Sequence, residues 1–409
     1  MSDAVSFDDI IEERHIIVCC GTGGVGKTTA AAVFAVEGAR RGRNAVVVTI
    51  DPAKRLANTL GLDSLSDTPH EIERHRWDRD GAAPPGGRLS ALMLDTKSTF
   101  DHLVVKHAAD DEQAQRILAN TFYRNVSTAL SGTQEYMAME KLHELHEEGG
   151  YDLIVVDTPP TRHALDFLDA PRRLARLLDN RIFRLLMMPT RAYLRAVGAG
   201  VHAFLRTVSR VVGSAVINDV VAFFRAFEGM EEGFRDRATE VLALLADPTS
   251  SFVLVTSPRR DAVEEATYFA ERLAESDIPV EGLIVNRVHP SFGDERVEGL
   301  RARAETLAVK ATDAASPAAE GDGAVSAERL ATLYDNLADF RQVADGERLH
   351  VAGVKARAGR AAVAFVPFLA GTCTTSRRSA KWAGTCSAPR PIALRLHEDP
   401  RRRRRTLGP

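Results

Sequence analysis

The segment from Gly21 to Thr29, GTGGVGKTT, has the residue types and spacing of a phosphate-binding loop. It follows the apolar run 15–20 and precedes an alanine-rich stretch that we predict to be helical. Glycines let backbone N–H groups approach phosphate oxygens, and the helix N-terminus adds its dipole. We expect Lys27 to reach the β- and γ-phosphates and the Thr28 hydroxyl to ligate Mg²⁺. The predicted nucleotide-binding residues here are Gly23, Gly24, Val25, Gly26, Lys27, Thr28 and Thr29.

Two carboxylates end apolar runs later in the chain. Asp157 ends the run 151–157, where a carboxylate of the Mg²⁺ shell belongs; an aspartate that starts a turn is the alternative. Asp51 ends the run 44–51 and precedes proline. Asp51 could orient or deprotonate an attacking water, and a turn-forming Asp-Pro explains it equally well. We predict Lys27, Asp51 and Asp157 as catalytic residues, and Thr28 and Asp157 as metal ligands.

Apolar runs typical of buried strands alternate with helical patterns along the chain. This alternation predicts an α/β fold with a doubly wound, mostly parallel sheet. Ligands of such sheets bind outside the carboxyl ends of the strands, where the loop and both aspartates should converge. We predict strands at 15–20, 44–51, 89–95, 151–157, 251–257, 280–286 and 361–366. We predict helices over most of 98–148 and 163–247 and at 261–275 and 326–345, a polar surface loop at 66–88 and a linker at 313–325.

Composition limits the class of protein. A hydrophobic content of 44% with ordinary charge indicates a globular chain. Residues 1–370 carry a net charge of −11, which disfavours nucleic acid as a partner. We find neither a secretory signal nor an apolar run long enough to span a bilayer, so we expect a cytoplasmic protein. The four cysteines form no C-x-x-C pair, so neither a zinc site nor a disulfide framework is predicted.

Together, three segments resemble one family of phosphate-loop ATPases. They are the phosphate loop, Asp-Pro-Ala at 51–53 and VVDTPPTRH at 155–163. The family comprises the arsenite-pump (ArsA) and Get-type tail-anchored-protein targeting ATPases, and the resemblance covers about 15–370. It implies an ATPase domain at 1–370 with helical insertions at about 98–148 and 163–247. It also implies a dimer whose ATP-driven closing moves the helical part to handle a hydrophobic membrane-protein segment or membrane partner.

The resemblance also assigns roles to residues. Asp51 would activate water, and residues 157–163 would couple the γ-phosphate to the helical insertion. The segment 131–135 resembles a family motif that precedes that strand. Asn286 and Arg287, in IVNRV, match the family's adenine-reading pair, and Pro367 lies in its adenine loop at 366–368. Without the resemblance, an ordinary asparagine at a strand end is the favoured interpretation of Asn286.

Thr22 departs from the family pattern. The family carries a lysine at this position that contacts phosphates across the dimer interface, and a hydroxyl cannot supply that charge. We therefore expect slow hydrolysis by the chain alone. We favour a heterodimer with a paralogue that brings the lysine over a homodimer. A nucleotide-binding regulatory subunit with weak catalysis is the alternative function.

The family's thiol sites are also missing. Soft As(III) needs thiolates, and Cys19 and Cys20 are too few and too close to the phosphate loop. An arsenite or anion pump subunit is therefore the less favoured enzyme alternative.

Two further segments have open interpretations. Residues 181–218 hold six arginines and no acid, with apolar residues at helical spacing. They form either the core of the helical insertion or a surface for an apolar client helix. Residues 371–409 carry a net charge of +8 and no periodicity. We interpret this basic tail as a shifted reading frame, with a polybasic arm as the alternative; the nucleotide sequence decides between them.

Overall fold

The computed structural model describes residues 5–51, 55–78, 81–129, 133–159, 219–220, 222–223, 226–227, 229–290, 292–314 and 322–368. The basic stretch 181–218, most of the predicted helical block 163–247 and the tail 371–409 lie outside these residues. So do the residues 160–163 of the predicted coupling segment.

The described strands form one eight-stranded sheet in the order β3-β4-β2-β5-β1-β6-β7-β8. Every neighbouring pair is parallel except β3 with β4. This confirms the predicted α/β fold with a mostly parallel sheet. The strands are β1 (Ile16–Cys20), β2 (Asn44–Thr49), β3 (His70–Glu71), β4 (Arg88–Met93), β5 (Leu153–Asp157), β6 (Ser250–Thr256), β7 (Val280–Val288) and β8 (Ala362–Pro367).

The sheet is buried on both faces. Alternate residues of β1 belong to different cores: Ile16 and Val18 pack into one hydrophobic cluster, and Ile17 and Cys19 into the other. This explains why the central strands are continuous apolar runs rather than alternating ones. One face is covered by α1 (Phe7–Glu13), α2 (Lys27–Arg40), α3 (Arg55–Leu60) and α4 (Arg74–Trp77).

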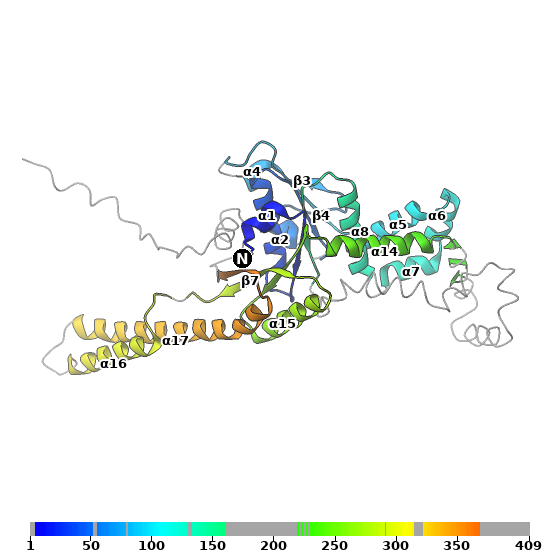
Figure 1. The fold of residues 1–409 in the computed structure, drawn as a ribbon. Coiled ribbons are helices and arrows are strands. Elements are labelled where there is room, and N and C mark those ends of the chain that lie inside the picture. Colours follow the sequence, from blue (N-terminus) through cyan, green and yellow to red (C-terminus); the bar gives the residue numbers. More distant parts are fainter. Residues whose placement is uncertain are drawn as a thin grey trace, which may run out of the picture.

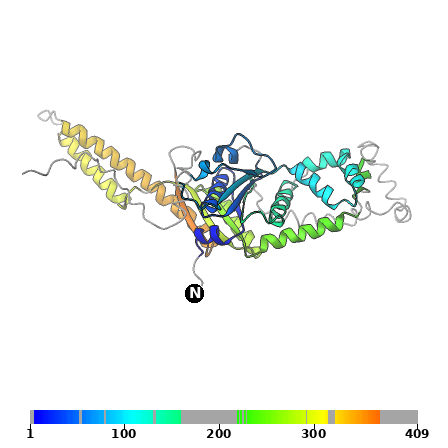
Figure 2. The same cartoon turned by 90° about the horizontal axis from the view of Figure 1, so that it is seen from above.

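The other face carries a larger helical layer. Its helices are α5 (Thr96–His107), α6 (Asp111–Leu118), α7 (Thr121–Ala129), α8 (Thr133–Glu147), α14 (Glu231–Ala246) and α15 (Arg260–Glu275). Figures 1 and 2 show α5 to α8 and α14 extending beyond one side of the sheet. Helix was predicted over most of 98–148 and is found there, and α8 and α14 lead directly into β5 and β6.

A long helical hairpin lies between β7 and β8. It consists of α16 (Val297–Ala314) and the 36-residue α17 (Asp322–Arg357), which pack along each other and project away from α5 to α8 (Figures 1 and 2). The predicted linker 313–325 is therefore too long, because helix occupies 313–314 and 322–325. Among the described helices, none combines the length and apolar character needed to cross a membrane.

Residues 66–88 are also more ordered than a surface loop. β3 pairs with β4 there, and α4 buries Trp77, whose indole N–H donates to the Ile72 carbonyl at 3.1 Å. Ile72, Trp77 and Ala83 are buried in this otherwise polar stretch and fix it against the sheet edge.

Candidate functional site

The glycine-rich segment forms a tight turn between β1 and α2. Gly21 and Gly26 have φ of +145° and +106°, conformations that favour glycine. A Cβ on Gly21 would lie 2.0 Å from the Val255 carbonyl oxygen, and one on Gly26 would lie 2.3 Å from Asn286 Nδ2. The backbone therefore packs directly on β6 and β7, leaving no room for side chains at these two positions. This is the cradle that a phosphate-binding loop requires.

Lys27 is the first residue of α2, and its side chain returns over the loop. The residue is only 6% exposed, and Nζ donates to the Thr22 carbonyl oxygen at 2.8 Å. Burial lowers the pKa of Lys27, while Asp157, Cys20 and Asp51 oppose that shift. The ammonium thus bonds to the loop and interacts electrostatically with two carboxylates.

Asp157 ends β5 and is completely buried. The Thr49 hydroxyl donates to its Oδ2 at 2.9 Å, whereas its Oδ1 has no hydrogen-bond partner among the described residues. Burial raises its pKa to about 6, opposed by hydrogen bonds from Thr28 and Thr49 and by Lys27. A buried carboxylate oxygen without a partner, next to a threonine hydroxyl at the phosphate loop, fits the predicted Mg²⁺ shell of Thr28 and Asp157.

Replacement of Asp157 by asparagine is expected to stabilise the ligand-free chain near neutral pH. The upward shift from 3.8 to about 6 corresponds to about 3 kcal/mol for holding a desolvated charge. Because the folded chain binds the proton more tightly, wild-type stability should rise as the pH falls through 6, and the advantage of Asp157→Asn should vanish only below the unfolded-state pKa of 3.8. Thermal unfolding of the wild type and Asp157→Asn, in the presence of a chelator and at several pH values from 7 down to below 4, measures this stability difference. An advantage that is independent of pH would contradict the assignment.

Asp51 follows β2 at the same edge of the sheet. Its side chain is 12% exposed, and Oδ2 pairs with Arg55 Nη1 at 3.3 Å. Thr49, Asp51 and Arg55 help line a cavity of about 80 Å³. A water needs roughly 15 Å³, so this cavity has room for a water beside the carboxylate.

The residues predicted to bind adenine lie near the carboxyl ends of β7 and β8. Asn286 Nδ2 donates to the Val25 carbonyl oxygen at 2.7 Å, and Asn286 Oδ1 accepts from the Arg287 N–H. Arg287 is exposed with φ of +62°, and Pro367 pairs in register with Val288. Asn286 therefore supports the phosphate loop, a contact the sequence alone did not reveal.

The sequence prediction missed two supporting residues. The Thr49 hydroxyl donates to Asp157, and Arg55 pairs with Asp51. Thr49 lies two residues before Asp51, so a polar residue at a strand end was the available signal. Thr158, within the predicted coupling segment 157–163, donates its hydroxyl to the Cys19 carbonyl oxygen at 2.8 Å. Of the predicted segment 131–135, residues 133–135 begin α8, but their side chains lie outside the described set.

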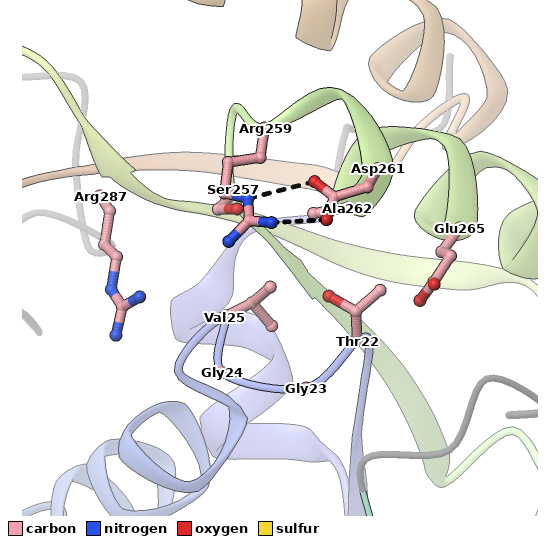
Figure 3. Close-up of a pocket in the computed structure, with 10 residues that line it drawn as sticks. All are labelled: Thr22, Gly23, Gly24, Val25, Ser257, Arg259, Asp261, Ala262, Glu265 and Arg287. Atoms are coloured by element: carbon pink, nitrogen blue, oxygen red, sulfur yellow. Dashed lines mark hydrogen bonds and ion pairs between the residues drawn. The ribbon is translucent and has the colours of Figure 1, made fainter.

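A second cavity, of about 260 Å³, is bordered by the phosphate loop itself. Figure 3 shows it between the loop residues Thr22 to Val25 and the segment from Ser257 to Glu265 at the start of α15, with Arg287 entering from β7. The 80 Å³ cavity beside Asp51 is instead lined by residues between 49 and 65 and by Met93.

The sequence model of a family described as anion-transporting ATPase matches residues 14–313. The chain belongs to this family. The match begins just before β1 and ends within α16, so it includes every predicted site residue except Pro367.

Individual relatives in this ATPase family carry two kinds of name. ATPase GET3 of Malassezia globosa is 24% identical over 295 residues, covering 71% of this chain and 78% of that protein. Arsenical pump-driving ATPase of Escherichia coli is 32% identical over 177 residues, covering 42% of this chain and 25% of that protein. ATPase ARSA1 of Chlamydomonas reinhardtii is 26% identical over 311 residues, covering 69% of this chain and 36% of that protein. The chain thus spans about a quarter of the length of the arsenical pump-driving ATPases it matches.

Proposed function

We propose that this chain binds ATP with Mg²⁺ at the loop Gly21–Thr29 and hydrolyses it. The observation that carries the proposal is the convergence of Lys27, Asp51 and Asp157 on one glycine cradle at the carboxyl edge of the sheet. Family membership and the names of the relatives agree with it. The direct test is nucleotide turnover by the purified chain, with protection from heat by ATP as the binding readout.

Each residue has a separate task in this proposal. Backbone N–H groups of the loop and the Lys27 ammonium bind the phosphates. Thr28 and Asp157 hold Mg²⁺, which when bound neutralises charge on the phosphate oxygens. Asp51 orients a water in its cavity and accepts the proton as the water attacks the γ-phosphorus, with ADP as leaving group. Asn286, Arg287 and Pro367 bind the base.

We propose further that nucleotide state reaches the helical layer through the ends of β2 and β5. Asp157 is joined to Thr49 across the sheet, and α8 leads directly into β5. A change at Asp157 can therefore be transmitted to α8 and the helices packed on it. By its likeness to the family, this motion in a dimer would handle a hydrophobic membrane-protein segment, which crosslinking to an apolar helix with and without ATP tests.

An arsenical pump subunit fits the structure less well. Cys19 and Cys20, the cysteines within the described residues, are 0% and 2% exposed, and burial raises the pKa of both thiols. Soft metalloids bind thiolates, which burial disfavours at both positions.

Thr22→Lys is expected to accelerate hydrolysis by the chain alone by about tenfold or more, because a cation near the transferring phosphate stabilises the transition state. The favoured paralogue that supplies such a lysine in trans should accelerate the wild type but add little to the variant. Steady-state rates for each chain, alone and mixed, measure this. A wild type that alone hydrolyses ATP as fast as Thr22→Lys would contradict the expectation and favour cations already present in the chain.

A further inference from the structure

The 260 Å³ cavity beside the phosphate loop contains positive charge that the proposed hydrolysis does not use. Its loop wall ends at Thr22, which contributes a neutral hydroxyl. Its opposite wall carries Arg259, Asp261 and Glu265. Figure 3 shows Arg259 and Glu265 facing the loop across the cavity, with the Asp261 carboxylate directed at Arg259.

Arg259 is placed at the rim of this cavity by the start of a helix. It is the N-cap residue of α15 and makes no side-chain cap to the backbone. Its guanidinium instead makes two hydrogen bonds to Asp261, Nε to Oδ1 at 3.1 Å and Nη2 to Oδ2 at 2.7 Å. The two side chains are 78% and 63% exposed. An exposed ion pair contributes little to stability, so the guanidinium is readily exchanged to another anion.

We propose that Arg259 binds the polyphosphate held by the loop, exchanging the Asp261 carboxylate for phosphate oxygens. The planar fork that fits the two oxygens of Asp261 fits two phosphate oxygens equally well. Lys27, the loop's own cation, is buried and its ammonium donates to the Thr22 carbonyl oxygen. Arg259 would add a second cation from the cavity side, where it can stabilise the negative charge on the transferring phosphate. The inference rests on the proposed ATP hydrolysis and adds a phosphate-contacting residue to it.

The neighbouring Arg260 is a matched control. It lies one position further along, is 85% exposed and pairs with Glu264 at 2.9 Å, but it does not line the cavity. Arg259 and Arg260 thus have the same charge, similar exposure and similar ion pairs. They differ in whether they face the phosphate loop.

The test compares Arg259→Ala, Arg260→Ala and Asp261→Asn in the full chain with Mg²⁺. Hydrolysis rates and the separate affinities for ATP and ADP are measured. Arg259→Ala should lower kcat at least about tenfold and weaken ATP more than ADP, because the lost contact includes the terminal phosphate. Arg260→Ala should match the wild type. Asp261→Asn releases the guanidinium and should hydrolyse ATP at least as fast as the wild type.

A second comparison separates lost charge from lost structure. A lysine at position 22 would enter the same cavity from the opposite wall, so Thr22→Lys should accelerate Arg259→Ala by a larger factor than it accelerates the wild type. Equal factors in the two backgrounds are expected if Arg259 only stabilises the start of α15.

The outcomes distinguish this inference from the function on which it rests. Equal rates and equal ATP-to-ADP affinity ratios in Arg259→Ala and Arg260→Ala would overturn the role of Arg259 and leave ATP hydrolysis standing. A loss in Asp261→Asn as large as in Arg259→Ala would also overturn it, since the ion pair itself would then be what matters. If the wild type and Lys27→Ala bind nucleotide equally poorly, the proposed function fails, and this inference fails with it.

Discussion

Lys27→Ala should reduce ATP hydrolysis by about three orders of magnitude or more, the largest catalytic effect we expect from a single substitution. The ammonium lies within the phosphate loop and near both carboxylates, so its removal takes away the cation closest to the bound phosphates. ATP binding should weaken too, because the loop also loses the hydrogen bond that fixes the Thr22 carbonyl. Hydrolysis rates and protection of the chain from heat by ATP measure the two effects.

Lys141→Ala controls for the removal of a buried lysine. Lys141 is 7% exposed, comparable to the 6% of Lys27, and its Nζ pairs with Glu144 at 2.8 Å on α8. It takes no part in the phosphate site. If Lys141→Ala lowered hydrolysis as much as Lys27→Ala, the loss would reflect general destabilisation, and the assignment of Lys27 would be wrong.

Arg237→Met should destabilise the chain by about 3–5 kcal/mol, the usual penalty for leaving a buried charge without its partner. Arg237 on α14 and Glu140 on α8 have side chains only 5% and 3% exposed, and the guanidinium Nε donates to Glu140 Oε1. Arg237 Nη1 also donates to Glu147 Oε2 at 2.7 Å, and this bond helps hold the pKa of Glu147 at about 2. Denaturant unfolding gives the free-energy change.

The double variant Arg237→Met, Glu140→Gln should recover much of that loss, because the unpaired carboxylate is then gone. Burial already raises the pKa of Glu140 despite the guanidinium and the more distant Lys106, so Arg237 is the main group that stabilises its charge. Arg260→Met, which breaks an exposed pair, should change stability by less than about 0.5 kcal/mol. If Arg237→Met had the same free energy of unfolding as the wild type, the buried pair of Arg237 and Glu140 would not stabilise the packing of α8 on α14.

The local sequence was sufficient for the parts of the site that lie within one segment. The phosphate loop is a contiguous motif whose glycines have a conformational requirement, so its turn and the helix after it were predicted from residues 15–35 alone. The seven predicted strands correspond to β1, β2 and β4 to β8, because strands buried on both faces must be apolar throughout. The prediction of a surface loop at 66–88 was wrong for the same reason. β3 is exposed and therefore has no apolar run, and α4 is held by the buried Trp77 rather than by a periodic apolar pattern.

What the sequence by itself determined is that a phosphate loop and two strand-ending aspartates lie at the same edge of a parallel sheet. Only the tertiary structure decided which side chains support them. The bonds from Thr49 to Asp157 and from Asn286 to the Val25 carbonyl join residues 108 and 261 positions apart, and Arg259 meets the cavity beside Thr22 only through the packing of α15. The physical reason is that strand order and helix packing set such contacts, and neither is encoded in the spacing of residues along one segment.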